Sequence, residues 1–172
     1  MVMGMMLQND IAIEACFMEN VYPSTCPSCG ADWPAAGQTC QEAFHQMLYW
    51  ENDDPRNGQV HHLAVLCYHL QHPELYSPEG LNYALGLLVD FLEHGQTPQQ
   101  LRRSARAQVA SGKRDWKITG RPGAVGGYAH PVRWSMTCRD VVAGGIENYV
   151  ASVNRWAAAV LADLRVSGYL SR

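Results

Sequence analysis

The sequence predicts a mainly helical, bundle-like domain with a cysteine-containing loop near its N-terminus and a small loop or hairpin insert. Apolar residues recur at helical spacing in four segments between residues 40 and 111, and three of these segments begin with a capping signal. The cysteine loop at 21–40 and a basic, Gly- and Pro-rich insert at 112–136 interrupt this pattern. With 172 residues, the chain is expected to form one domain over 1–172 and to bury a core without disulfides.

Five or so helices are expected, over 40–51, 59–72, 78–94, 98–111 and 140–166, in addition to a short helix over 1–20. Four of them follow a residue whose side chain can cap the first turn: Thr39, Ser77, Thr97 and Thr137. Pro73 ends the 59–72 helix, and Gly95 ends the helix after it. The Gly144-Gly145 pair is expected to kink the last helix.

The net charge of −3 is the sum of an acidic N-terminal half and a basic C-terminal half. Residues 1–86 carry a net charge of −9, with Arg56 as their single cation, whereas residues 87–172 carry +6. A hydrophobic content of 47% excludes a disordered tail protein, and no apolar run approaches the roughly 18 residues of a membrane span. The N-terminal sequence lacks the basic start and apolar core of a signal peptide, so we expect a cytoplasmic protein.

The sharpest motif is the cysteine pair of the loop at 21–40. Cys26 and Cys29 can grip one zinc ion from a tight turn, in which Gly30 supplies the left-handed backbone position. Cys40 follows at the expected start of a helix, where the helix dipole favours the thiolate. This pattern predicts one structural zinc ion; the alternative is a pair of free or transiently oxidised thiols. The other three cysteines are expected to be small core residues: Cys16, Cys67 and Cys138.

The fourth zinc ligand must be a histidine, an acid or Cys67, because the chain has no second CxxC motif. If the helices over 40–51 and 59–72 form an antiparallel hairpin, the end of the second helix lies near Cys40. We therefore rank His72 first, His69 second and His45 third.

The helix over 59–72 carries a second candidate site. His61 and His62 are expected near Glu51 at the turn of the helical hairpin, with His130 arriving from the insert. These four residues are candidates for a second metal site or a general acid/base pair, and so for a metal-dependent hydrolase. The simpler alternative is that the histidines are polar residues at the border of a helix.

The insert and its flanks predict a site for a small anion. Nine cations and one acid lie between residues 101 and 139, interleaved with aromatic residues and with glycines that let backbone N–H groups approach a ligand. The insert is also expected to contain a hairpin of strands at 115–119 and 132–136. The candidate anion-binding residues are Lys113, Arg114, Lys117, Arg121 and Arg133.

Taken together, these motifs resemble a family of small, uncharacterised bacterial proteins that share a domain of unknown function. The resemblance covers about residues 26–165 and implies no activity. The residues that carry it are the Cys26-Pro27-Ser28-Cys29-Gly30 string, Cys40, His61, Gln71-His72-Pro73, Trp116-Lys117 and His130-Pro131.

The sequence thus predicts a cytoplasmic, zinc-binding helical protein that binds a small anionic ligand. One alternative is a nucleic-acid-associated regulatory module that uses the insert, although a pI near 6.1 speaks against a dedicated nucleic-acid surface. The other is the metal-dependent hydrolase. As a further alternative, the insert packs against the acidic half or against a second subunit, and the latter would make the protein a homo-oligomer. No membrane association is expected.

Overall fold

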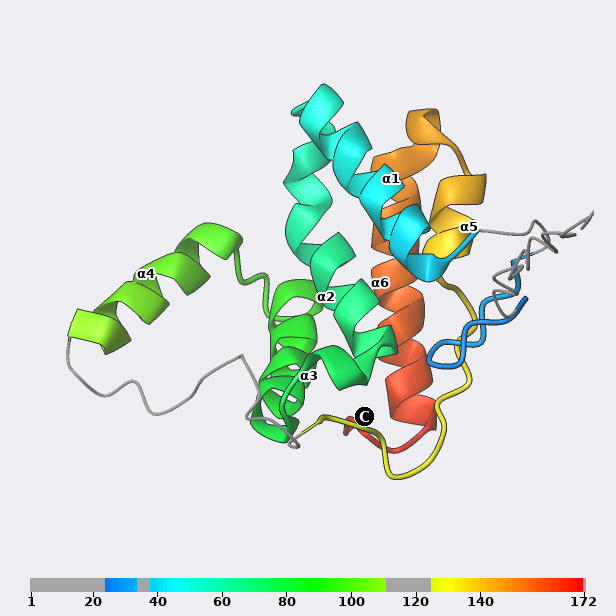
Figure 1. Cartoon of the computed structure of the whole chain (residues 1–172). Coiled ribbons are helices and arrows are strands. Elements are labelled where there is room, and N and C mark those ends of the chain that lie inside the picture. Colours follow the sequence, from blue (N-terminus) through cyan, green and yellow to red (C-terminus); the bar gives the residue numbers. More distant parts are fainter. Residues whose placement is uncertain (1–23, 34–37, 111–124, 172) are drawn as a thin grey trace, which may run out of the picture.

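The computed structural model describes residues 24–33, 38–110 and 125–171, and this part of the chain is mainly helical (Figure 1). Short 3₁₀ turns lie at Asn57–Val60, Pro73–Leu75 and Ile146–Asn148. Within these ranges there is no β-sheet, only an isolated bridge between Thr25 and Asp32. The predicted mainly helical class is therefore confirmed. The α-helices are α1 (Cys40–Asp53), α2 (His61–Gln71), α3 (Pro78–Leu92), α4 (Pro98–Ala110), α5 (Cys138–Ala143) and α6 (Tyr149–Val166).

Helix α6 is the central helix of the bundle. It packs against α2, α3 and α5, while α1 packs against α5 and α2. Its buried stripe follows helical spacing, so one face of the helix meets the core. Helix α4 stands apart from the other helices in Figure 1. None of the helices described has the length and apolar content needed to cross a membrane. The largest fully buried side chains of α6 are Tyr149, Val153, Trp156, Val160 and Leu164.

The predicted capping residues set the starts of the helices. The Thr39 hydroxyl accepts a hydrogen bond from the backbone N–H of Glu42 at 3.1 Å, and the Ser77 hydroxyl accepts one from Gly80 at 3.1 Å. Each bond satisfies an N–H that has no partner within its own helix. Gly95, with φ of +63°, follows the end of α3. The starts predicted for α1 and α3 are therefore confirmed.

The last helix is broken where the sequence predicted a kink. Instead of one helix over 140–166, α5 ends before Gly144, and α6 begins only after a 3₁₀ turn. Gly145 has a φ of +73°, a left-handed conformation that ends a right-handed helix. A Cβ atom on Gly144 would lie 3.0 Å from the Ser152 hydroxyl, so the two segments meet closely at this glycine pair.

The hairpin predicted in the insert is wrong where the structure describes it. Residues 132–136 are irregular rather than extended into a strand, because their polar groups bond to helices instead of to a neighbouring strand. The backbone N–H and the hydroxyl of Ser135 both donate to Asp163, at 2.7 and 2.9 Å, and Gln71 donates to the Met136 carbonyl at 2.7 Å. The predicted strand at 115–119 and the predicted helix at 1–20 lie outside the described residues.

Candidate metal centre

The loop at 24–33 presents two thiols from one tight turn. The backbone N–H of Cys26 donates to the carbonyl of Ala31 at 2.8 Å, and that of Gly30 donates to the carbonyl of Cys26 at 2.9 Å. Gly30 has a φ of +73°, which a residue with a Cβ rarely adopts. This turn brings the side chains of Cys26 and Cys29 to the same side of the loop.

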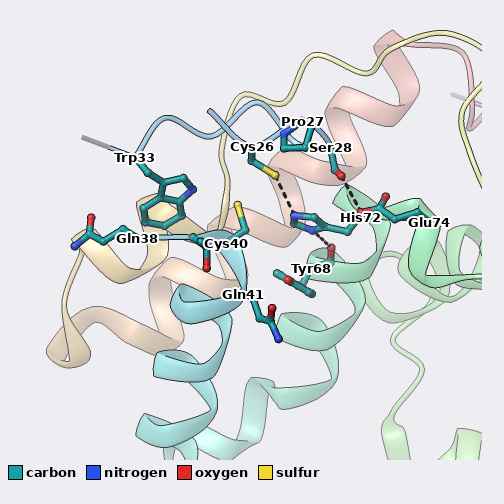
Figure 2. Close-up of a pocket in the computed structure, with 11 residues that line it drawn as sticks. Cys26, Pro27, Ser28, Trp33, Gln38, Cys40, Gln41, Tyr68, His72 and Glu74 are labelled. Atoms are coloured by element: carbon teal, nitrogen blue, oxygen red, sulfur yellow. Dashed lines mark hydrogen bonds between the residues drawn. The ribbon is translucent and has the colours of Figure 1, made fainter. Parts of the chain in front are cut away.

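Two helix termini supply the remaining side chains of the cluster. Cys40 is the first residue of α1, and His72 directly follows α2. The His72 ring is fixed by a 2.7 Å hydrogen bond between Nδ1 and the carbonyl of Tyr68, which leaves Nε2 directed at Cys26 (Figure 2). The loop, α1 and α2 therefore converge on one point.

Four potential ligand atoms meet there. The Sγ atoms of Cys29 and Cys40 are 3.4 Å apart, and Sγ of Cys26 lies 3.5 Å from Nε2 of His72. All four ligand atoms lie within 4.8 Å of one another, and all but Cys26 are buried. Zn–S bonds of about 2.3 Å in a tetrahedral site place two sulfurs about 3.8 Å apart, so this spacing fits a tetrahedral ion. The group can hold a metal ion.

Hydrogen bonds within the cluster lower the pKa of two of its thiols, Cys40 and Cys26. Side-chain hydrogen bonding with Cys138, Cys26 and Cys29 lowers the pKa of Cys40. Hydrogen bonding with Cys26 and Cys40 instead raises the pKa of Cys29. Burial lowers the pKa of His72, but its bonds to Cys26, Cys40 and the Tyr68 carbonyl outweigh burial and raise this pKa to about 10. These shifts favour a thiolate beside a positively charged His72 ring, which is the charge arrangement that a metal cation can stabilise in place of the proton.

The buried indole of Trp33 gives a second, independent indication of a negatively charged centre at this cluster. The side chain is 8% exposed, and its indole N–H is buried without a hydrogen-bond partner. Figure 2 shows the indole nitrogen on the side of the ring that faces Cys26 and Cys40. A buried donor without an acceptor costs about 1–3 kcal/mol, so a negatively charged metal–thiolate centre suits this position.

The other candidate ligands lie outside the cluster. The ring of His69 packs against Phe44, Tyr68 and Tyr76, with centroids 5.2 to 6.3 Å away. His45 is exposed on α1. The expected helical hairpin of residues 40–51 and 59–72 favours His72 over both. His72 is the histidine that the structure places among the three cysteines.

Cys138 is a neighbour that the sequence pattern assigned to the core. It is fully buried in the first turn of α5, and its thiol donates a hydrogen bond to the main-chain carbonyl of Cys40. The only sequence signal was the capping box of Thr137 and Asp140, which places Cys138, like Cys40, at the start of a helix. Cys67 is also fully buried; burial alone raises its pKa.

The histidine site predicted near Glu51 assembles only in part. His61 Nδ1 lies 2.5 Å from a Glu51 oxygen, but the ring of His62 packs edge-on against Phe91 instead. His130 bonds through its backbone to the Tyr169 hydroxyl, which follows the C-terminal end of α6. Glu51 contacts the opposite end of α6, about 27 Å away along 18 residues. The structure therefore pairs Glu51 with His61 but places His62 and His130 elsewhere.

The predicted anion site lies mostly outside the described residues. Lys113, Arg114, Lys117 and Arg121 fall in the range 111–124, which the structure does not describe. Arg133 is exposed, and no acid among the described residues forms an ion pair with it. Anion binding by this group stays a prediction.

Comparison with known proteins places the chain in a family. No curated protein and no solved structure matches it. A family model described as "Family of unknown function (DUF5946)" matches residues 24–165, which contain the four-residue cluster and almost all of the described helices. This match confirms the resemblance to a family of unknown function. The chain therefore belongs to the family of unknown function DUF5946.

Proposed function

We propose that Cys26, Cys29, Cys40 and His72 bind one zinc ion and that this zinc is structural. The convergence of their four ligand atoms to within 4.8 Å carries the proposal. Three soft thiolates and one imidazole nitrogen form a donor set typical of tetrahedral zinc. Because the protein supplies four ligands, the zinc needs no water, and this is the pattern of structural rather than catalytic sites.

The fold gives such a zinc a clear structural role. Within residues 24–33, the backbone bonds are one isolated bridge and a few turn hydrogen bonds, so a cross-link to the helices adds order to this loop. Two of the four ligands come from this loop, and the other two come from the ends of α1 and α2. A bound zinc therefore cross-links the loop to both helices.

Metal analysis of the purified chain tests this proposal. We expect about one zinc per chain, and we expect Cys26→Ser to lower both zinc content and thermal stability. Cys67→Ala is the control for zinc content, because it removes a buried thiol outside the cluster. A wild-type chain that folds without bound metal would rule the proposal out.

A small anionic ligand is the second proposed function, and the arginines of α4 support it. Arg102, Arg103 and Arg106 are exposed, no acid lies on this helix, and none of the ion pairs in the described part includes them. Helix α4 directly precedes the insert at 112–136, which contains the predicted anion-binding residues. Titration with inorganic phosphate should shift the NMR signals of this region. Retention on DNA or RNA without a response to phosphate would favour the nucleic-acid alternative.

A further inference from the structure

The cluster opens into a pocket that is larger than a metal ion needs. The pocket has a volume of about 230 Å³ and lies between the loop, the start of α1 and the end of α2 (Figure 2). Cys26, Cys40 and His72 line it, whereas Cys29 does not. A single water needs only about 10–15 Å³ of such a cavity, so a small organic molecule fits beside the metal.

The pocket wall is negative when zinc is bound. Three thiolates and one zinc ion leave a charge of about −1, because His72 then binds as a neutral ligand. The Glu74 carboxylate at the rim adds another negative charge, held in place by a 2.8 Å hydrogen bond from the Ser28 hydroxyl. Among the described residues, no lysine or arginine lines the pocket. The N-terminus of α1, whose first residue is Cys40, supplies only about half a positive charge.

The remaining wall provides neutral hydrogen-bonding groups. Gln38 and Gln41 are exposed at the mouth of the pocket, and their side-chain oxygens can accept hydrogen bonds. Tyr68 contributes a ring edge, since its two faces are covered by Phe44 at 4.1 Å and His72 at 4.3 Å between ring centroids. Such a wall suits a short apolar chain that ends in a hydrogen-bond-donating cation.

We propose that this pocket binds an alkylammonium group. The proposal rests on the zinc proposed above, because the thiolate charge counted here is that of the loaded centre. An ammonium group offers three donors, which Glu74 and the Gln38 and Gln41 amide oxygens can accept. The group can come from a free amine or from a lysine side chain of another protein, and the two sources share this chemistry.

Binding of matched four-carbon compounds to the zinc-loaded protein tests the proposal. The probes are n-butylamine, n-butanol and butyrate, which each contain four carbons in an unbranched skeleton but carry a positive, zero and negative charge. We expect n-butylamine to bind at least about tenfold more tightly than n-butanol, and butyrate to bind least. N-acetyl-lysine methylamide binding more tightly than n-butylamine would indicate a protein partner, and the reverse order a free amine.

Substitution of Glu74 separates a specific site from general attraction to an acidic protein. Glu74→Gln should weaken n-butylamine binding about fivefold, whereas Glu79→Gln should leave it unchanged, because Glu79 is exposed on α3 and lies outside the pocket. Equal binding of n-butylamine and n-butanol, a preference for butyrate, or equal effects of the two substitutions would overturn the proposal. Zinc content measured on the same samples distinguishes the failures: a zinc-loaded chain that binds no amine overturns only this inference, and a chain without zinc overturns both.

Discussion

The Sγ atom of Cys138 lies 3.8 Å from the main-chain carbonyl oxygen of Cys40, although 98 residues separate them in the sequence. The proximity of this thiol is also the first cause of the lowered pKa of Cys40. Cys138 thus connects α5 to the candidate metal centre without belonging to the four-residue ligand cluster.

Replacing Cys138 should therefore weaken metal binding. Groups that hydrogen-bond to a metal ligand typically contribute 10–100-fold to affinity, so we expect Cys138→Ala to weaken zinc binding about tenfold. Cys138→Ser keeps a donor and should lose less. Competition with a chromophoric chelator measures the affinities, and Cys67→Ala is the control for loss of a fully buried thiol. If Cys138→Ala and Cys67→Ala had equal zinc affinities, Cys138 would have no role at the centre.

A buried carboxylate joins three helices at the other end of the bundle. Glu51 on α1 accepts a 2.6 Å hydrogen bond from the Tyr149 hydroxyl on α6 and contacts His61 on α2. Tyr149→Phe leaves one buried carboxylate oxygen without this partner, so we expect it to lower the free energy of unfolding by about 1–3 kcal/mol. Urea denaturation of the variant measures this loss.

Tyr49→Phe is the control for the Tyr149 substitution. Tyr49 is 61% exposed on α1, and removal of an exposed hydroxyl usually changes stability by less than about 0.5 kcal/mol. Similar losses for the two variants would mean that the Tyr149 hydroxyl does not stabilise the junction of α1, α2 and α6.

Removal of the metal should release the loop at 24–33 before it affects the helices. We expect a zinc chelator to speed hydrogen exchange of the Cys26 and Gly30 amides, while amides in the middle of α6 stay protected. The thermal midpoint should also fall, because zinc stabilises only the folded state. Cys26→Ser should respond much less to the chelator. Uniform loss of protection across the chain would instead show that the metal holds the whole bundle together.

The sequence predicts local features of this protein better than distant contacts. Thr39 and Ser77 mark helix starts through hydrogen bonds that span only three residues, so these signals do not depend on how the helices pack together. Cys26, Cys29 and Cys40 could be grouped because their spacing is short, and a simple helical hairpin brought His72 to them. Cys138 could not be placed at the cluster, because its position depends on how α5 packs against α1.

The incorrect predictions have the same physical origin. The expected strand at 132–136 is absent because Ser135 bonds to Asp163 on α6, a partner 28 residues away that no local pattern reveals. The helix expected over 140–166 breaks because Gly145 adopts a left-handed conformation, which its sequence permits but does not require. His130 could be assigned to His61 only by assuming how the insert folds back, and the structure places it at the far end of α6.

The stability of the protein should depend on pH through His62. Burial first, and the nearby His61 second, lower the pKa of His62 below its ordinary value of 6.5, while Glu51 acts in the opposite direction. The unfolded state therefore binds a proton at a higher pH than the folded state does. As the pH falls through 6.5, protonation favours unfolding, and this contribution to stability is lost until the pH passes below the folded pKa.

An NMR titration of the His62 ring should give a midpoint below 6.5. His62→Asn should make the free energy of unfolding depend less steeply on pH between about 5 and 6.5, compared with the wild type under the same metal load. His94→Asn is the control, because His94 is exposed and pairs with Asp90 on the surface of α3. A His62 midpoint at or above 6.5 would contradict the burial of its neutral ring against Phe91.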